Sequence, residues 1–391
     1  MKRDLEIYIH IPFCIKKCAY CDFLSGPGNE EAIDRYVKAL LDEIRGISET
    51  DIPLSFFGDV TSVFFGGGTP SVLTGEQLKK IMDTLRTNFS VAADAEITIE
   101  ANPGTVTKEK LSIYSEIGIN RISFGLQSTN NEELKLLGRI HTYEEFLESY
   151  KMARECGFHN INVDLISAIP RQTVESWEQS LKEIVKLNPE HISAYSLIIE
   201  EGTLFAKVYG EGTSKEEELP TEDEERLMYQ RTEEILNDAG YHRYEISNYA
   251  KEGKECKHNL GYWERKDYLG LGLGASSLID NVRFKNTDDM ETYIRFASNP
   301  FQMREDEEKL SKEAQMEEFV FLGLRKMKGI SIKEFEVTFG KRLEECYGQN
   351  IKRMQKEKLV VIEDNFLRLT QKGIDISNYV FAEILNEGTS N

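Results

Sequence analysis

Short runs rich in β-branched and aromatic residues alternate with longer segments of helical periodicity through the first half of the chain. The segment 30–48 places its apolar side chains on one broad face, as an amphipathic helix does. Further helices are expected at about 75–88, 107–117, 143–156 and 173–187. The strands expected around them are 6–11, 62–65, 96–100, 121–126, 160–166 and 191–198. Strands that alternate with helices are typical of βαβ units and predict an α/β fold with a parallel sheet.

The number of repeating units limits the architecture. Six strand-and-helix units are too few for a closed eight-stranded barrel. The pattern therefore leaves two arrangements open, a partial barrel and a doubly wound sheet, and right-handed crossovers apply to both.

The pattern changes after about residue 210. The acidic stretch 210–225 indicates a surface connection into a helix near 222–238. The strand-like segment YHRYEISNYA follows, and then the glycine-rich run YLGLGLGASS, which predicts a close approach of the backbone to a neighbour. From about 310, helices flank KLVVIEDNFLRLT, which is typical of a hairpin with its turn near 363–365. The expected domains are 1–210, a connecting and barrel-completing region at 211–305, and a winged-helix-like domain at 306–391.

The charge of the chain narrows the classes of partner. The 391 residues carry a formal net charge of −20, which argues against non-specific nucleic-acid binding and against docking on an anionic membrane. No apolar run is long enough for a spanning helix, and the N-terminus resembles a first strand more than a signal peptide. We therefore expect a cytoplasmic protein with no nucleic-acid partner, which meets a membrane only through another protein.

Three of the six cysteines fall within one short segment. Cys14, Cys18 and Cys21 follow the first expected strand, whereas Cys156, Cys256 and Cys346 are scattered. Three close thiolates can ligate three irons of a cubane cluster and leave the fourth iron open. A structural zinc site needs four ligands, but position 23 is Phe and His10 lies on the strand. The spacing favours an iron–sulfur cluster, with zinc or simple packing as alternatives.

The segment HIPFCIKKCAYCDF resembles the signature of radical S-adenosylmethionine enzymes, near the branch of oxygen-independent coproporphyrinogen III oxidase and its relatives. The resemblance covers nearly the whole chain. It implies a partial (β/α)6 barrel that holds a [4Fe–4S] cluster, with S-adenosylmethionine on the open iron. It also implies an electron donor such as flavodoxin or ferredoxin, and, if radical chemistry occurs, cleavage of S-adenosylmethionine to methionine and a 5′-deoxyadenosyl radical.

The same resemblance implies the residues that contact S-adenosylmethionine. Taken alone, these residues would be a tight glycine turn, surface charges and core side chains. Most lie at or just beyond the C-terminal ends of expected strands, where ligands of parallel α/β proteins gather. Ala168 and Arg171 stand where the family more usually has glycine. The implied contacts are Tyr8, Gly67, Gly68, Thr69, Glu100, Gln127, Arg139, Asp164 and Ile198.

A second motif, HNxxYW, resembles a mark of HemW-type heme chaperones. It comprises His258, Asn259, Tyr262 and Trp263. A histidine can ligate heme iron, and aromatic rings can stack on a porphyrin. Cys256 is an alternative iron ligand, and a structural loop beside S-adenosylmethionine is an alternative role for the whole motif. The resemblance implies delivery of heme to an acceptor protein such as a respiratory cytochrome.

Three other functions stay open. The pattern of the oxidase resembles Cys-x3-Cys-x2-Cys-x-Cys and is preceded by an N-terminal extension. This chain has Phe23 at the position of the fourth cysteine, and thirteen residues stand before Cys14. A radical methyltransferase is a further enzyme class, although no dedicated methyl-acceptor cysteine is identifiable. A cluster-bearing structural protein without catalysis is the last alternative.

Overall fold

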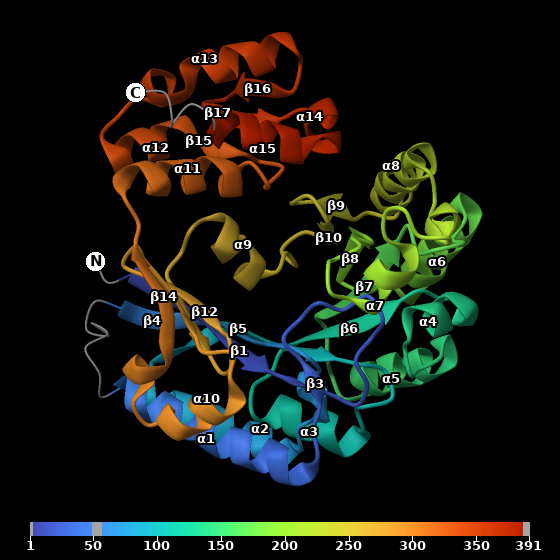
Figure 1. Ribbon diagram of the computed structural model, residues 1–391, viewed down its shortest axis with the longest axis vertical. Helices are drawn as coiled ribbons and strands as arrows, with labels where there is room; N and C mark the ends of the chain where they lie inside the picture. Colours follow the sequence, from blue (N-terminus) through green and yellow to red (C-terminus); the bar gives the residue numbers. More distant parts are fainter. Residues whose placement is uncertain (1–2, 49–56, 386–391) are drawn as a thin grey trace.

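The computed structural model describes residues 3–48 and 57–385, so the ends of the first and last expected domains lie outside the described residues. A curved sheet of twelve strands in the order β14-β13-β12-β11-β1-β4-β5-β6-β7-β8-β10-β9 forms the centre of the molecule (Figure 1). Its six expected parallel strands are β1 Arg3–Ile11, β4 Phe57–Gly67, β5 Val91–Ala101, β6 Arg121–Gln127, β7 Ile161–Ser167 and β8 His191–Ser196. The α/β class and the partial barrel are confirmed.

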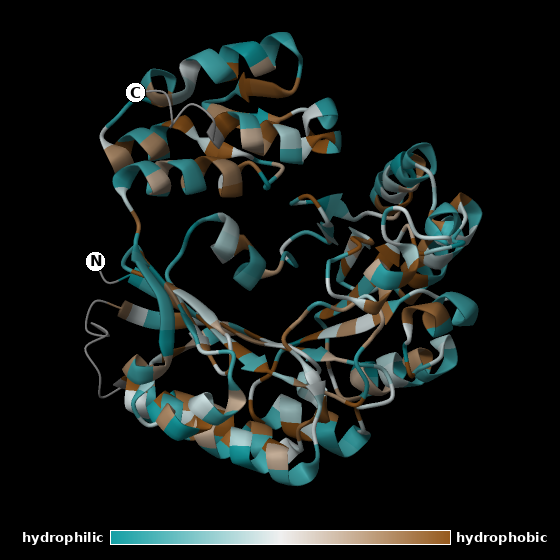
Figure 2. Cartoon of the chain, in the orientation of Figure 1, coloured by the Kyte–Doolittle hydropathy of each residue, from teal (hydrophilic) through white to brown (hydrophobic). Residues whose placement is uncertain are grey.

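The parallel strands present different chemistry on their two faces. In β1, Leu5, Ile7 and Ile9 are buried in the main hydrophobic cluster, whereas Glu6 and Tyr8 alternate with them and take the opposite face. Figure 1 shows the helices along the outer side of the sheet, and Figure 2 shows hydrophilic and hydrophobic segments alternating along them. The outer helices are α1 Glu30–Ser48, α2 Gly75–Asn88, α3 Lys108–Glu116, α4 Asn131–Leu137, α5 Tyr143–Glu155, α6 Val174–Leu187 and α8 Glu222–Asp238.

Threonine side chains fix the start of several outer helices. Thr74, Thr107, Thr142 and Thr173 each accept a hydrogen bond from a backbone N–H in the first turn of the helix that follows. Such caps satisfy donors that have no partner inside a helix. The expected bounds of these four helices agree with the observed ones to within one or two residues.

The second half of the chain extends the sheet at both edges. Strand β11 (Tyr268–Leu271) pairs in parallel with β1, so the described part of the twelve-stranded sheet contains seven parallel strands instead of the six expected. The glycine-rich run forms this strand. Gly272 follows it with φ +101°, and a side chain there would come within 2.4 Å of Tyr36 Oη. The other added strands are β12 Ser276–Ile279, β13 Val282–Asn286, β14 Arg304–Lys309, β9 His242–Arg243 and β10 Asn248–Ala250.

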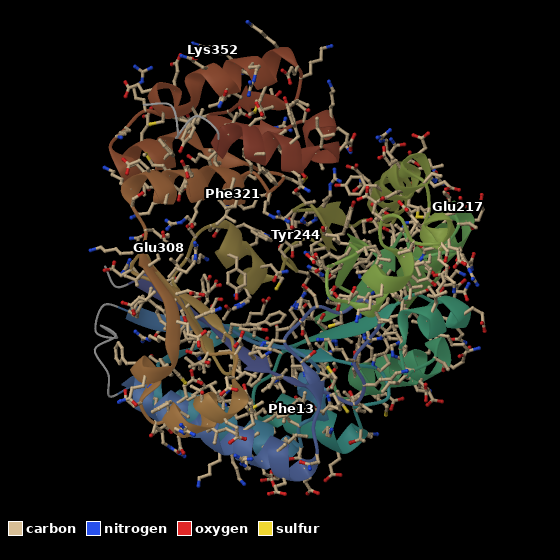
Figure 3. The ribbon with its side chains drawn as sticks, in the orientation of Figure 1. Phe13, Glu217, Tyr244, Glu308, Phe321 and Lys352 are labelled. Atoms are coloured by element: carbon tan, nitrogen blue, oxygen red, sulfur yellow. The ribbon has the colours of Figure 1, made fainter. Side chains whose placement is uncertain are left out.

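A separate hydrophobic cluster stabilises the C-terminal part of the chain. Its hairpin turns at Asp364 and Asn365, both with positive φ, as a two-residue turn between paired strands requires. Figure 3 shows Tyr244 between the barrel and these C-terminal helices, and Tyr244 O accepts from Met327 N at 3.0 Å. The elements are α11 Lys312–Gly323, β15 Ile330–Ser331, α12 Ile332–Phe339, α13 Leu343–Lys356, β16 Val360–Glu363, β17 Phe366–Leu369, α14 Gln371–Asp375 and α15 Ser377–Leu385.

The remaining elements connect these layers. They are β2 Phe13–Cys14, β3 Gly26–Pro27, α7 Leu204–Tyr209, α9 Lys257–Trp263 and α10 Met290–Phe296. Helix α9 lies on the open side of the barrel, between the sheet and α11 (Figure 1). Among the described residues, no helix has the length and apolar character needed to cross a membrane.

Candidate functional site

The cysteine segment forms a loop that is closed at its base and packed at its middle. Its ends pair as β2 and β3, with Phe13 opposite Gly26. Between them, Ala19 N donates to Leu137 O at 3.0 Å, and Ala19 O accepts from Phe205 N at 3.0 Å. All three thiols are free and half-buried. The barrel therefore holds this loop from α4 and from α7.

The glycine segment after β4 lies directly against the cysteine loop. Gly68 N donates to Ile11 O at 2.8 Å, and Thr69 N donates to Phe13 O at 2.8 Å. A side chain at Gly68 would come within 2.7 Å of Phe13 O and 3.0 Å of Cys14 Sγ. Only glycine allows this approach, so the end of β4 and the cysteine loop form one surface.

That surface borders a cavity of about 390 Å³, within the range of small-molecule sites. The three cysteines line it together with all but one of the residues expected to contact S-adenosylmethionine, the exception being Tyr8. Ile198 lies two residues beyond the end of β8 and is 68% exposed, which excludes the alternative of a core side chain. The lining includes Cys14, Cys18, Cys21, Gly67, Gly68, Thr69, Glu100, Gln127, Arg139, Asp164 and Ile198.

Two carboxyl groups face this cavity from β5 and β7. Asp164 accepts from Ser123 Oγ at 2.9 Å and from Asn162 Nδ2 at 2.8 Å. Burial, and then the charge of Asp164, raise the pKa of Glu100 to about 8. Burial also raises the pKa of Asp164. A cationic or hydroxyl-bearing ligand would relieve the cost of ionising these groups.

Arg139 lies beside the ends of β5 and β6, directly after Gly138, the glycine that caps α4. Its Nη2 donates to Gly125 O and to Asn102 Oδ1, and its Nη1 donates to Cys18 Sγ at 3.4 Å. Its Nε–H is buried and has no partner in the described part of the chain. The guanidinium is therefore fixed beside the thiols, with one donor still unsatisfied.

Several lining residues were missed by the sequence analysis. Asn102 follows Glu100 in EANPG, and Tyr195 is near the end of β8, so both lie at strand ends, where ligand contacts are expected. Tyr20 lies between Cys18 and Cys21 and stacks edge-on against Phe205. These side chains add a second amide and two phenol groups to the lining of the cavity.

Helix α9 carries the HNxxYW motif, and its histidine is enclosed. His258 is 1% exposed; its Nδ1 lies 2.8 Å from Ser62 Oγ and its Nε2 lies 3.1 Å from Tyr262 Oη. Its ring stacks on Phe64, with centroids 5.1 Å apart, and on Tyr8 at 6.4 Å. Burial, and then Arg121, lower the pKa of His258 to about 3, so the ring is neutral.

The other members of the motif lie around this histidine and on the far side of α9. Asn259 is half-buried, and Arg325 of the C-terminal part stacks 4.5 Å above the ring of Trp263. Cys256 is the N-cap residue directly before α9; it is fully buried, and its Sγ lies 3.5 Å from Glu96 Oε1. None of these residues lines the cavity beside the cysteine loop, so the structure forms two separate groups of candidate residues.

Comparisons with known proteins agree with this arrangement. The model of the Radical SAM superfamily matches residues 8–184, and that of the HemN C-terminal domain matches residues 310–376. The structure of coproporphyrinogen III oxidase (HemN) from Escherichia coli superposes with a TM-score of 0.84 at 26% identity, over 98% of this chain and 90% of that one.

Two full-length relatives identify the branch. The heme chaperone HemW of Lactococcus lactis subsp. lactis (strain IL1403) is 36% identical over 98% of both chains. The heme chaperone HemW of Bacillus subtilis (strain 168) is 38% identical over 97% of this chain and 99% of its own. The chain therefore belongs to the radical SAM superfamily and, within it, to the family of HemW heme chaperones.

Proposed function

We propose that this protein binds a [4Fe–4S] cluster, S-adenosylmethionine and heme, and delivers the heme to an acceptor protein. The observation that carries the first part is the single cavity shared by the three cysteines and eight of the nine candidate contacts. The observation that carries the second part is the family of its full-length relatives.

The chemistry of the cavity fits both groups. Cys14, Cys18 and Cys21 would ligate three irons, and the bound cluster would supply a one-electron reductant to S-adenosylmethionine. The unsatisfied donor of Arg139 suits the carboxylate of that ligand. Glu100 and Asp164 suit its amino group and its ribose hydroxyls, because each ligand group offers protons to an acceptor that is costly to bury alone.

The heme part of the proposal requires a change in α9. Both ring nitrogens of His258 have partners, and the side chain has almost no exposure. If His258 is the iron ligand, its Nε2 must leave Tyr262 and α9 must move out of the barrel. Asn259 and Trp263 would then move with it, and the indole of Trp263 would be free to stack on the porphyrin.

A heme titration tests this assignment. The wild-type chain should bind ferric heme with a new absorption band, and His258→Ala should change both the spectrum and the affinity. His242→Ala is a matched control, because His242 is a surface histidine paired with Glu255. An unchanged spectrum and affinity in His258→Ala would remove His258 as the ligand and leave Cys256 as the next candidate.

The likeness to coproporphyrinogen III oxidase supports a second candidate, oxidative decarboxylation of coproporphyrinogen III. Phe23 occupies the position of the oxidase's additional cysteine, and it lines the cavity with 60% exposure. Decarboxylation and heme binding should be measured on one anaerobically reconstituted sample. Robust decarboxylation without heme binding would favour the oxidase over the chaperone.

The partners follow from this proposal. A flavodoxin or ferredoxin would supply the electron, and a respiratory cytochrome is the type of acceptor we propose. We place the exchange in the cytosol, with membranes reached only through the acceptor, because the net charge of −20 disfavours direct contact with anionic lipid.

A further inference from the structure

Asn102 joins the surroundings of two of the three clustered thiols. Its Nδ2 donates to Thr69 Oγ1 at 2.8 Å, and its Oδ1 accepts from Arg139 Nη2. At one end of this chain Thr69 Oγ1 lies 3.5 Å from Cys14 Sγ, and at the other Arg139 Nη1 lies 3.4 Å from Cys18 Sγ. The contacts form one continuous path from Cys14 to Cys18 through Thr69 and Asn102, which follow β4 and β5, and Arg139, which follows α4.

The guanidinium of Arg139 determines which group donates and which accepts in every hydrogen bond of this path. Arginine has donors only, so Asn102 must turn its oxygen toward Arg139. The amide nitrogen of Asn102 must then point the other way and donate to the Thr69 hydroxyl. The Thr69 oxygen accepts that bond, which leaves its own proton for Cys14 Sγ. One fixed charge thus directs a proton donor onto each of two thiols.

The backbone of Asn102 is held independently of this path. Asn102 N donates to Ser71 Oγ at 3.2 Å, and Asn102 O accepts from Thr105 Oγ1 at 2.6 Å. The turn after β5 therefore presents the amide in one place, and a change of the amide's chemistry leaves the turn's own hydrogen bonds intact.

We propose that Asn102 is a positioning residue that sets the reduction potential of the cluster, an inference that rests on the proposed function. By fixing the direction of the Thr69 hydroxyl, it keeps a donor on the Cys14 thiolate, and it holds Arg139 on Cys18. Hydrogen bonds to ligating sulfurs favour the reduced, more negative cluster and raise its potential. Loss of the directed donor therefore lowers the potential.

The test is a set of EPR-monitored redox titrations on anaerobically reconstituted full-length protein without S-adenosylmethionine. Asn102→Asp keeps the shape but only accepts, so the Thr69 proton turns away from Cys14 toward the new carboxylate. Thr69→Val removes the same donor. Each variant should lower the potential, and the double variant should lower it by less than the sum of the two, because both act on one hydrogen bond.

Two further variants separate this effect from general disturbance of the site. Thr69→Ser keeps a hydroxyl and should restore the wild-type potential. Thr105→Val disturbs the same turn but touches no sulfur and no guanidinium, so its potential should match the wild type. Additive shifts, or a Thr69→Val potential equal to the wild type, would overturn the inference.

The design also covers failure of one variant to hold a cluster. If Asn102→Asp assembles none, the comparison of Thr69→Val with Thr69→Ser still tests the hydrogen bond to Cys14 through which Asn102 acts. A wild-type chain that assembles no cluster would overturn the proposed function, and this inference with it. A wild-type cluster whose reduction potential does not change in Thr69→Val would overturn this inference and leave the proposed function intact.

Discussion

The carboxyl group of Glu6 lies directly against the backbone of Gly261. A methyl group at position 261 would come within 2.1 Å of Glu6 Oε1. Glu6 belongs to the first strand of the barrel and Gly261 to α9, so the helix enters the barrel at a point where no side chain fits. Glu6 Oε2 has no hydrogen-bond partner in the described part of the chain, although it lies 3.6 Å from His258 Nδ1.

Gly261→Ala should therefore displace α9. We expect a loss of unfolding free energy of about 1–3 kcal/mol, as for other overpacked sites, measured by urea denaturation. In a Glu6→Ala background the same substitution should cost less, because the opposing carboxylate is gone. An equal loss of unfolding free energy in the two backgrounds would show that Glu6 does not oppose a side chain at position 261.

The titration of Glu6 should affect stability in neutral solution. Burial, the largest cause, raises the pKa of Glu6 to about 8, above its usual value of 4.5. The folded chain thus keeps a proton that the unfolded chain has lost, and stability falls as pH rises from about 4.5 to about 8. Glu6→Gln cannot ionise, so its stability relative to wild type should increase over this interval, by at most about 1.4 kcal/mol per pH unit. Parallel stability curves from pH 5 to 9 would contradict the assignment.

Glu318 should hold the C-terminal part of the chain against the barrel. From α11 it pairs with Arg265 Nε at 2.8 Å and with Arg283 Nη2 at 2.7 Å. Glu318→Gln leaves two arginines without this carboxylate, and we expect the free energy of unfolding to fall by an amount on the order of 2–3 kcal/mol. Hydrogen exchange should become faster in α9 and α11. Glu317→Gln, one residue earlier, is the control, and equal exchange in the two variants would contradict this role.

The sequence predicted the parts of the fold that local patterns determine. The run of β-branched and aromatic residues at 121–126 identified β6, and helical periodicity identified α2 and α5, whose starts the threonine caps fix in the structure. The cysteine spacing and the glycine segment predicted neighbouring positions, because both follow parallel strands and their C-terminal ends share one edge.

The remaining features depend on contacts between distant segments. The pairing of β11 with β1 joins Glu6 to Tyr268, and a hydrogen bond joins Ser62 to His258, 196 positions away. No local pattern indicates either contact. Tyr8, expected at the S-adenosylmethionine site, packs its ring on His258 and does not line the cavity, and its contact with the ligand stays a prediction. The division into three domains stays a prediction.

The most direct test of the account is the iron content of the anaerobically reconstituted chain. Wild type and Cys156→Ser should each hold about four irons and four sulfides per chain, because Cys156 lies outside the cavity. Cys14→Ser, Cys18→Ser and Cys21→Ser should each lose most of this iron while remaining folded by circular dichroism. A Cys18→Ser chain with a full cluster would contradict the assignment of the cysteine loop, on which the proposed function depends.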